Sequence, residues 1–145
     1  MAKLNLSKAM RFMEKGLTKV WGKIKFTYTT VSNDEIKATA DVTLGQFDDS
    51  IAVVINGYKG GGAQFRAVFD KLDKNSQTLA LIHDFNQDNI FFKAYIRNDG
   101  YLELYNFIVC FDEGIYKDYP SEFMYRLCNL ADNAILKQLV ALTHA

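Results

Sequence analysis

Side chains capable of acid–base or metal chemistry are few and scattered in this chain. Of its two histidines, His83 lies beside Asp84 in a segment with helical spacing. An imidazole beside a carboxylate can act as a general base, but no convincing nucleophile accompanies it. The acidic pairs Asp48-Asp49 and Asp112-Glu113 would need further convergent ligands to bind a metal ion. We therefore expect no catalytic residue, no metal site and no cofactor.

Three consecutive glycines, residues 60–62, invite comparison with a phosphate-binding loop. Such a loop needs a Gly-Lys-Ser/Thr sequence at the start of a helix, whereas here Lys59 precedes the glycines and a strand-like segment follows. A dinucleotide-binding fingerprint would need glycine at position 65, which is Phe65. We interpret the run as a connection between strands in which glycine supplies a positive φ.

The overall composition predicts one soluble globular domain, residues 1–145. The chain is 49% hydrophobic and 23% charged, with a net charge of zero. Neutrality argues against a nucleic-acid partner, and the absence of a long apolar run argues against membrane insertion. We see no signal peptide, and the two cysteines lack ligand spacing. These features favour a cytoplasmic location.

The periodicity of apolar residues predicts an α+β domain with the order α-β-β-β-β-α-β-β-α. Helical spacing marks residues 5–22, part of 73–89, and 120–142, where Pro120 suits a first helical turn. Alternation or continuous apolar character marks the strands 24–31, 36–44, 50–58, 63–72, 90–97 and 101–111. Consecutive strands with helices on one face make a two-layer domain with an antiparallel sheet. The expected core includes Phe26, Ala40, Val53, Phe69, Phe92, Leu104, Leu127 and Leu130.

The last two strands are joined by Asn98-Asp99-Gly100, and two loop lengths are conceivable. A three-residue loop with Gly100 in the left-handed region pairs Tyr95 with Glu103 and Ile96 with Leu102. It also pairs Ile90 with Ile108. A two-residue loop would set Ile96 opposite Glu103, so we favour the longer loop.

Two surfaces are candidates for binding a partner. In the favoured register Phe91, Tyr95, Tyr101, Tyr105 and Phe107 share one sheet face with Lys93, Arg97 and Glu103. A sheet face that only meets solvent does not need so many aromatic side chains, and such a cluster is typical of a contact site. From this face we nominate Phe91, Tyr95, Tyr105 and Phe107. The alternative is that part of the chain's own C-terminal segment, or a strand twist, covers them. In the last helix, Leu136 and Val140 fall outside the main apolar arc, which a homodimer or a wedged helix would explain.

The N-terminal helix carries a basic stripe, Lys8, Arg11, Lys15 and Lys19. Residues 1–25 hold seven Lys/Arg and one Glu, while the other 120 hold ten Lys/Arg and sixteen Asp/Glu. The chain is therefore polarised, +6 against −6. The stripe is either a solvated helix face or a contact for an acidic partner, for example an acidic patch around Asp118 of a second subunit.

The order of these elements resembles the YbjN-like family, whose fold is that of the type III secretion chaperones. The resemblance is best where a helix ends in Asp84-Phe85-Asn86 and an aromatic strand and the turn 98–100 follow. It implies a small non-enzymatic module, often dimeric, that binds other proteins. The glycine run after Lys59 departs from the family.

We therefore expect a cytoplasmic protein-interaction module, chaperone-like or regulatory, with a protein partner or a homodimer. A different possibility is a small-ligand-binding protein or enzyme with a pocket lined by Phe26, Tyr28 and His83. Single-stranded nucleic acid stacking on the aromatic strand is a third, but only Lys93 and Arg97 supply cations there.

Overall fold

A computed structural model describes residues 5–22, 24–43, 50–109 and 113–143 of the chain. Its elements are α1 (Leu6–Trp21), β1 (Thr27–Ser32), β2 (Glu35–Val42), β3 (Ile51–Tyr58), β4 (Gly62–Lys71), α2 (Ser76–Asp88), β5 (Lys93–Ile96), β6 (Tyr101–Val109), α3 (Glu113–Asn129), a 3-10 turn (Leu130–Asp132) and α4 (Ala134–Thr143).

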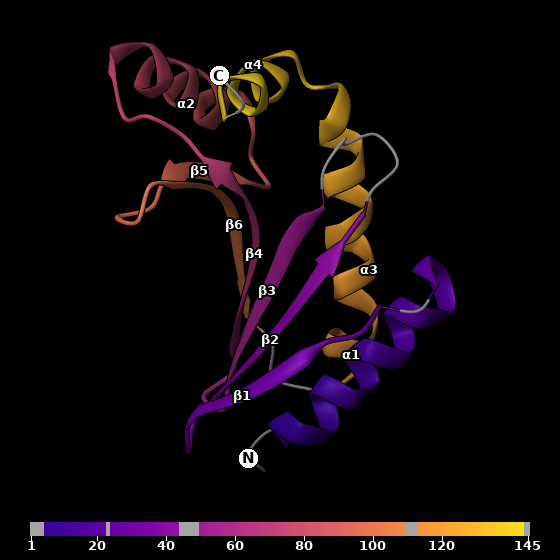
Figure 1. Ribbon diagram of the computed structural model, residues 1–145. Coiled ribbons are helices and arrows are strands. Elements are labelled where there is room, and N and C mark those ends of the chain that lie inside the picture. Colours follow the sequence, from indigo (N-terminus) through magenta and orange to yellow (C-terminus); the bar gives the residue numbers. More distant parts are fainter. Residues whose placement is uncertain (1–4, 23, 44–49, 110–112, 144–145) are drawn as a thin grey trace.

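The strands form one antiparallel sheet with the order β1-β2-β3-β4-β6-β5. Strands β1 to β4 follow one another as a meander, and β6 lies between β4 and the edge strand β5. Helices α1 and α3 lie side by side on one face of the sheet, while α2 and α4 pack together near β5 (Figure 1). The predicted α+β architecture and element order are confirmed. None of the described helices covers the opposite side of the sheet over β1–β4, and we call that side the outer face.

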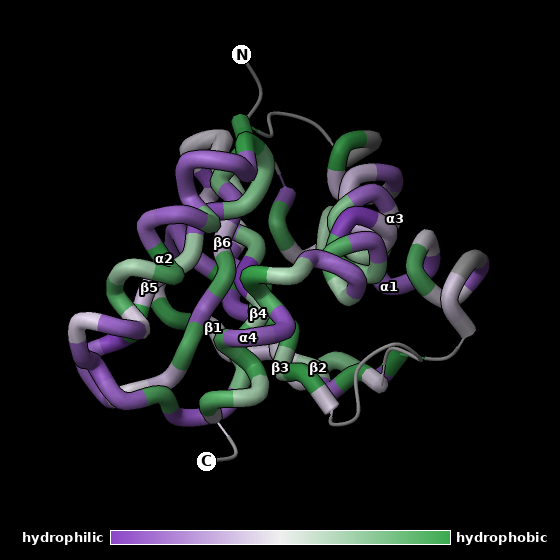
Figure 2. The backbone as a smooth tube through the Cα atoms, turned by 90° about the horizontal axis from the view of Figure 1, so that it is seen from above, coloured by the Kyte–Doolittle hydropathy of each residue, from purple (hydrophilic) through white to green (hydrophobic). Residues whose placement is uncertain are grey.

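Helix α1 forms because its apolar residues recur every three or four positions, which produces one buried stripe. The Asn5 side chain accepts a hydrogen bond from the Lys8 N–H at 3.1 Å and caps the first turn. Gly22, with φ +81°, ends the helix. Seen from above, α1 and α3 each alternate between hydrophobic and hydrophilic residues (Figure 2). The buried residues of α1 include Leu6, Met10, Met13 and Leu17.

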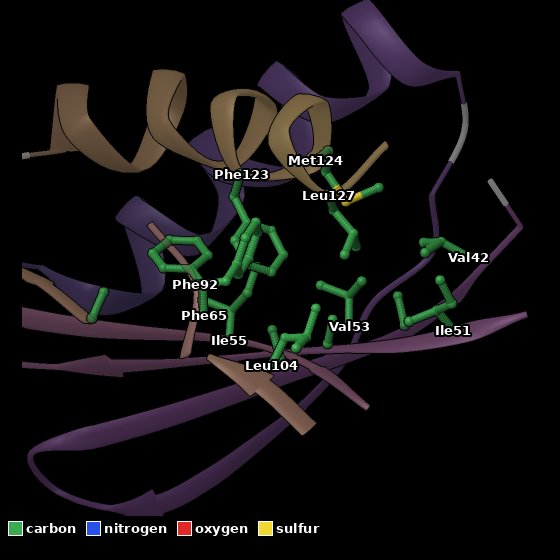
Figure 3. Packing of buried hydrophobic residues seen from close by; sticks show 14 of the residues in the cluster. Val42, Ile51, Val53, Ile55, Phe65, Phe92, Leu104, Phe123, Met124 and Leu127 are labelled. Carbon is green, nitrogen blue, oxygen red and sulfur yellow. The ribbon is translucent and has the colours of Figure 1, made fainter. Parts of the chain in front are cut away.

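The core between α3 and the sheet is rich in aromatic rings (Figure 3). The Phe123 ring lies 5.4 Å from the rings of both Phe65 and Phe92, centroid to centroid, and Leu127 lies one turn further along the helix. Of the core residues expected from sequence, Phe69 alone is half-buried rather than buried.

The predicted hairpin register is confirmed where the strands pair. Tyr95 lies opposite Glu103 and Ile96 opposite Leu102. Gly100 has φ +93°, and the Arg97 N–H donates to the Tyr101 carbonyl at 2.8 Å. The glycine interpretation is also confirmed, because Gly61 turns the β3–β4 hairpin with φ +105°.

The expected start of β5 at Ile90, and its pairing with Ile108, are wrong. The strand begins at Lys93 because side chains, not a neighbouring strand, bond the backbone before it. Asn89 accepts from the Phe92 N–H at 2.8 Å, and Asn106 donates to the Phe91 carbonyl at 2.8 Å.

The expected single C-terminal helix is also wrong. Pro120 lies inside α3 rather than at a helix start, and the chain leaves helical geometry at Asn133, with ψ +122°. The Asn133 side chain accepts from the backbone N–H groups of Ile135 and Leu136 and so begins a new helix. Helix α4 then packs against α2, and Leu136 is buried. Contacts within one chain therefore explain the wide apolar arc of this C-terminal segment.

Candidate binding face

The outer face carries a buried carboxylate. Glu103 lies on β6 with none of its surface exposed. Arg66 of β4 approaches Glu103 Oε1 at 3.3 Å and Arg97 approaches the same oxygen at 3.6 Å. The Tyr95 hydroxyl donates to the other oxygen, Oε2. Both carboxylate oxygens are therefore engaged, which is how a buried charge is normally stabilised.

The hydrogen bonds continue from this carboxylate across the sheet. Arg66 Nη2 donates to Asn56 Oδ1 at 2.7 Å, and Asn56 Nδ2 donates to Glu35 Oε2 at 2.8 Å. We call these six residues the outer-face network; they are Glu35, Asn56, Arg66, Tyr95, Arg97 and Glu103. The network joins β2, β3, β4, β6 and the β5 hairpin, and it fixes the relative positions of these strands.

Tyr95 is held as a neutral hydrogen-bond donor. Burial raises its pKa to about 12, with further contributions from its hydrogen bond to Glu103 and from the negative charge of that residue; Arg66 and Arg97 oppose the rise. The phenol therefore stays protonated at neutral pH and keeps donating to the carboxylate.

Aromatic rings lie beside the network. The rings of Tyr95 and Tyr105 meet edge to face at 5.5 Å, a favourable geometry for an aromatic pair. Further along β6, Phe107 is 58% exposed and Val109 is exposed as well. A Cβ atom on Gly62 would lie 2.6 Å from the Phe107 ring. The glycine thus lets this ring rest directly against the backbone of β4.

The structure brings Tyr95, Tyr105 and Phe107 together on the outer face as expected, but Phe91 is not among them. The Phe91 ring lies 6.1 Å from that of Tyr119 and under the guanidinium of Arg126, at 4.5 Å, both on α3. It leaves the outer face because β5 begins only at Lys93. Lys93 itself donates to the carbonyls of Asn86 and Asn89 at the end of α2.

The remaining nominated residues lie elsewhere. The four cations of the basic stripe are exposed on α1, and in the described residues none forms an ion pair. Leu136 is buried and Val140 packs against the core. His83 is exposed on α2. The pairs Asp48-Asp49 and Asp112-Glu113 lie wholly or partly outside the described residues, and the described part holds no group of three or more potential metal ligands.

One hollow of about 510 Å³ lies at the start of α1, away from the outer face. Its lining includes Leu6, Thr30, Ile36 and Lys59. It contains none of the residues expected to line a ligand pocket, Phe26, Tyr28 and His83.

Sequence reasoning missed Asn56 and Arg66. Asn56 interrupts an otherwise apolar strand, and Arg66 occupies an outward position between the buried Phe65 and Ala67. Both signals are visible in the sequence, but their partners follow only from the register of three strands.

No family model matches the chain, and neither the curated proteins nor the solved structures contain a match. Among the described residues no helix has the length and apolar character to cross a bilayer.

Proposed function

We propose that this chain is a non-enzymatic protein-interaction module, chaperone-like or regulatory, that binds a partner protein through its outer face. The resemblance to the YbjN-like family and a cytoplasmic location belong to the same proposal. The observation that carries it is the exposed aromatic surface of β6 beside the hydrogen-bonded outer-face network.

The geometry suits an interface anchor. Phe107 rests against Gly62, and the Tyr95–Tyr105 pair is held by the hydrogen bond from Tyr95 to Glu103. Rings already held in place lose little conformational freedom on binding, and this favours affinity. Aromatic residues in such positions dominate the binding energy of many interfaces.

The charges of the outer-face network indicate what kind of partner fits. Arg66 and Arg97 are paired with Glu103, and Arg97 is also 2.9 Å from Asp99. Because these charges are neutralised within the chain, a partner gains little from carrying charge opposite them. We therefore expect a protein with an apolar contact surface and binding that changes little with salt.

Site-directed photo-crosslinking tests this proposal. A p-benzoylphenylalanine in place of Phe107 should crosslink to a distinct protein, identified by mass spectrometry, in a lysate of the source cells. The same residue in place of Tyr125 is a matched control, since Tyr125 is also 58% exposed but lies on α3. The Phe107 crosslink should survive added salt and disappear with a second substitution, Tyr105→Ser.

Identical products at both positions, or no product at position 107, would overturn the proposal. A product at twice the chain mass alone would also overturn it, because the outer face would then serve self-association.

A further inference from the structure

Within the part of the chain that the structure describes, the sheet has one open edge, at β1. All six residues of this strand are exposed, and its pairing partner is β2. Within the described residues, no backbone hydrogen bond beyond that ladder reaches the strand. The outward-facing N–H and C=O groups of such an edge are a template for another strand.

The opposite edge, β5, is covered. It has four residues, and the Asn86 side chain of α2 bonds the outward backbone groups of Ala94. Asn86 Oδ1 accepts from the Ala94 N–H at 2.7 Å, and Nδ2 donates to the Ala94 carbonyl at 3.0 Å. The fold therefore blocks one edge with a side-chain amide and leaves the other open.

Along Thr27–Thr30, where its pairing with β2 is regular, β1 lacks the devices that keep an edge from pairing. Thr27–Ser32 contains no charged residue, no proline and no glycine, and it is rich in β-branched side chains. Its pairing with β2 is irregular only between Thr30 and Ser32, next to the turn. The strand is thus well suited to accept a further strand along Thr27–Thr30.

The charges around β1 match those of a second, antiparallel copy. Exposed Lys25 lies two residues before the strand, and exposed Asp34 lies two residues after it. When two copies pair antiparallel about Thr29 or Thr30, the uncharged strands lie opposite each other. Lys25 of each copy then approaches Asp34 of the other, so opposite charges meet at both ends.

We propose that β1 pairs with β1 of a second copy of this chain, which extends the sheet across a twofold axis. Antiparallel pairing at an edge places the axis perpendicular to the sheet, so both outer faces lie on the same side of the dimer. The inference does not depend on the proposed function. If both hold, the dimer presents two partner-binding faces side by side.

Sedimentation velocity over a wide range of protein concentration tests the pairing. The full chain should reach twice its 16.5 kDa mass. The double variant Thr29→Lys/Val31→Lys, which places like charges along the seam, should raise the dimer dissociation constant at least about tenfold. A matched variant, Thr29→Val/Val31→Thr, keeps β1 neutral and β-branched and should leave the constant unchanged.

A charge-swap mixture makes the test specific. The lysine variant mixed with Thr29→Glu/Val31→Glu should form a heterodimer, whereas each variant alone stays monomeric. Circular dichroism should show that all variants remain folded, since both positions are exposed in the monomer.

Two results would overturn the proposal. If the wild type stays monomeric, β1 does not pair with a second copy of the chain. An extended segment of another protein would then be the candidate partner of this edge. A dimer that the lysine pair does not weaken would place self-association on another surface, and crosslinking at position 107 would then show whether the outer face provides it.

Discussion

Glu103→Gln is the most informative single change on the outer face. Glutamine keeps the size of the side chain and its carbonyl oxygen but removes the negative charge. Two arginines then lose their shared carboxylate, and the Tyr95 hydroxyl loses a charged acceptor. We expect the free energy of unfolding to fall.

The size of this loss of unfolding free energy depends on how deeply the two arginine partners of Glu103 are buried. Removing one member of a buried ion pair costs about 3–5 kcal/mol because the remaining charge is left unpaired in a poorly solvated site. Here the side chains of Arg66 and Arg97 are 20% and 32% exposed, so water compensates part of the loss. We therefore expect a loss of about 2–3 kcal/mol.

The pair Glu122–Arg126 on α3 is the matched control. Its atoms are closer, at 2.7 Å, but both side chains are 49% exposed. Glu122→Gln should cost no more than about 0.5 kcal/mol. Urea unfolding, followed by circular dichroism, measures both changes. If the two variants lose the same stability, burial does not decide the strength of these pairs and the reasoning fails.

Three further changes test other parts of the structure. Leu127→Ala removes a fully buried side chain and should cost about 2–5 kcal/mol in urea unfolding, mainly through the cavity that it leaves; a smaller loss would mean that the core collapses around the site. Because the pKa of Tyr95 is raised to about 12, the stability that this phenol contributes is present below about pH 10 and is lost as the pH rises towards 12. Tyr95→Phe should therefore flatten the stability profile in that window, and a profile identical to that of the wild type would contradict the assignment. Asn86→Ala exposes the backbone groups of Ala94 and should increase aggregation in light scattering, whereas unchanged scattering would show that the amide is not what protects this edge.

The local pattern of apolar and polar residues was sufficient to predict the structure wherever a single strand or turn determines it. The polarity alternation around residues 98–100 selected the three-residue loop, because a shift by one residue would turn apolar side chains outwards. The same alternation placed Tyr95, Tyr105 and Phe107 on one face.

Local pattern was insufficient where a side chain bonds a distant backbone. Nothing near Ile90 reveals that Asn106, on another strand, bonds the Phe91 carbonyl and delays β5. The end of helical geometry at Asn133 could not be predicted for a related reason, because the helical spacing of apolar residues continues through this position. The Asn133 side chain caps the next helix instead of continuing the previous one. The pairing of Asn56 with Arg66 likewise depends on strand register.

The contact between α1 and α3 bears on how the chain is made. The two helices lie side by side (Figure 1), yet roughly 90 residues separate the end of α1 from the start of α3. At about 5–20 residues per second, the ribosome needs on the order of 5–20 seconds to synthesise that stretch. During this time α1 lacks its neighbouring helix α3, so the nascent chain leaves part of the apolar stripe of α1 exposed. Folding during synthesis can therefore complete the sheet meander early, but it closes the helical layer only when α3 emerges.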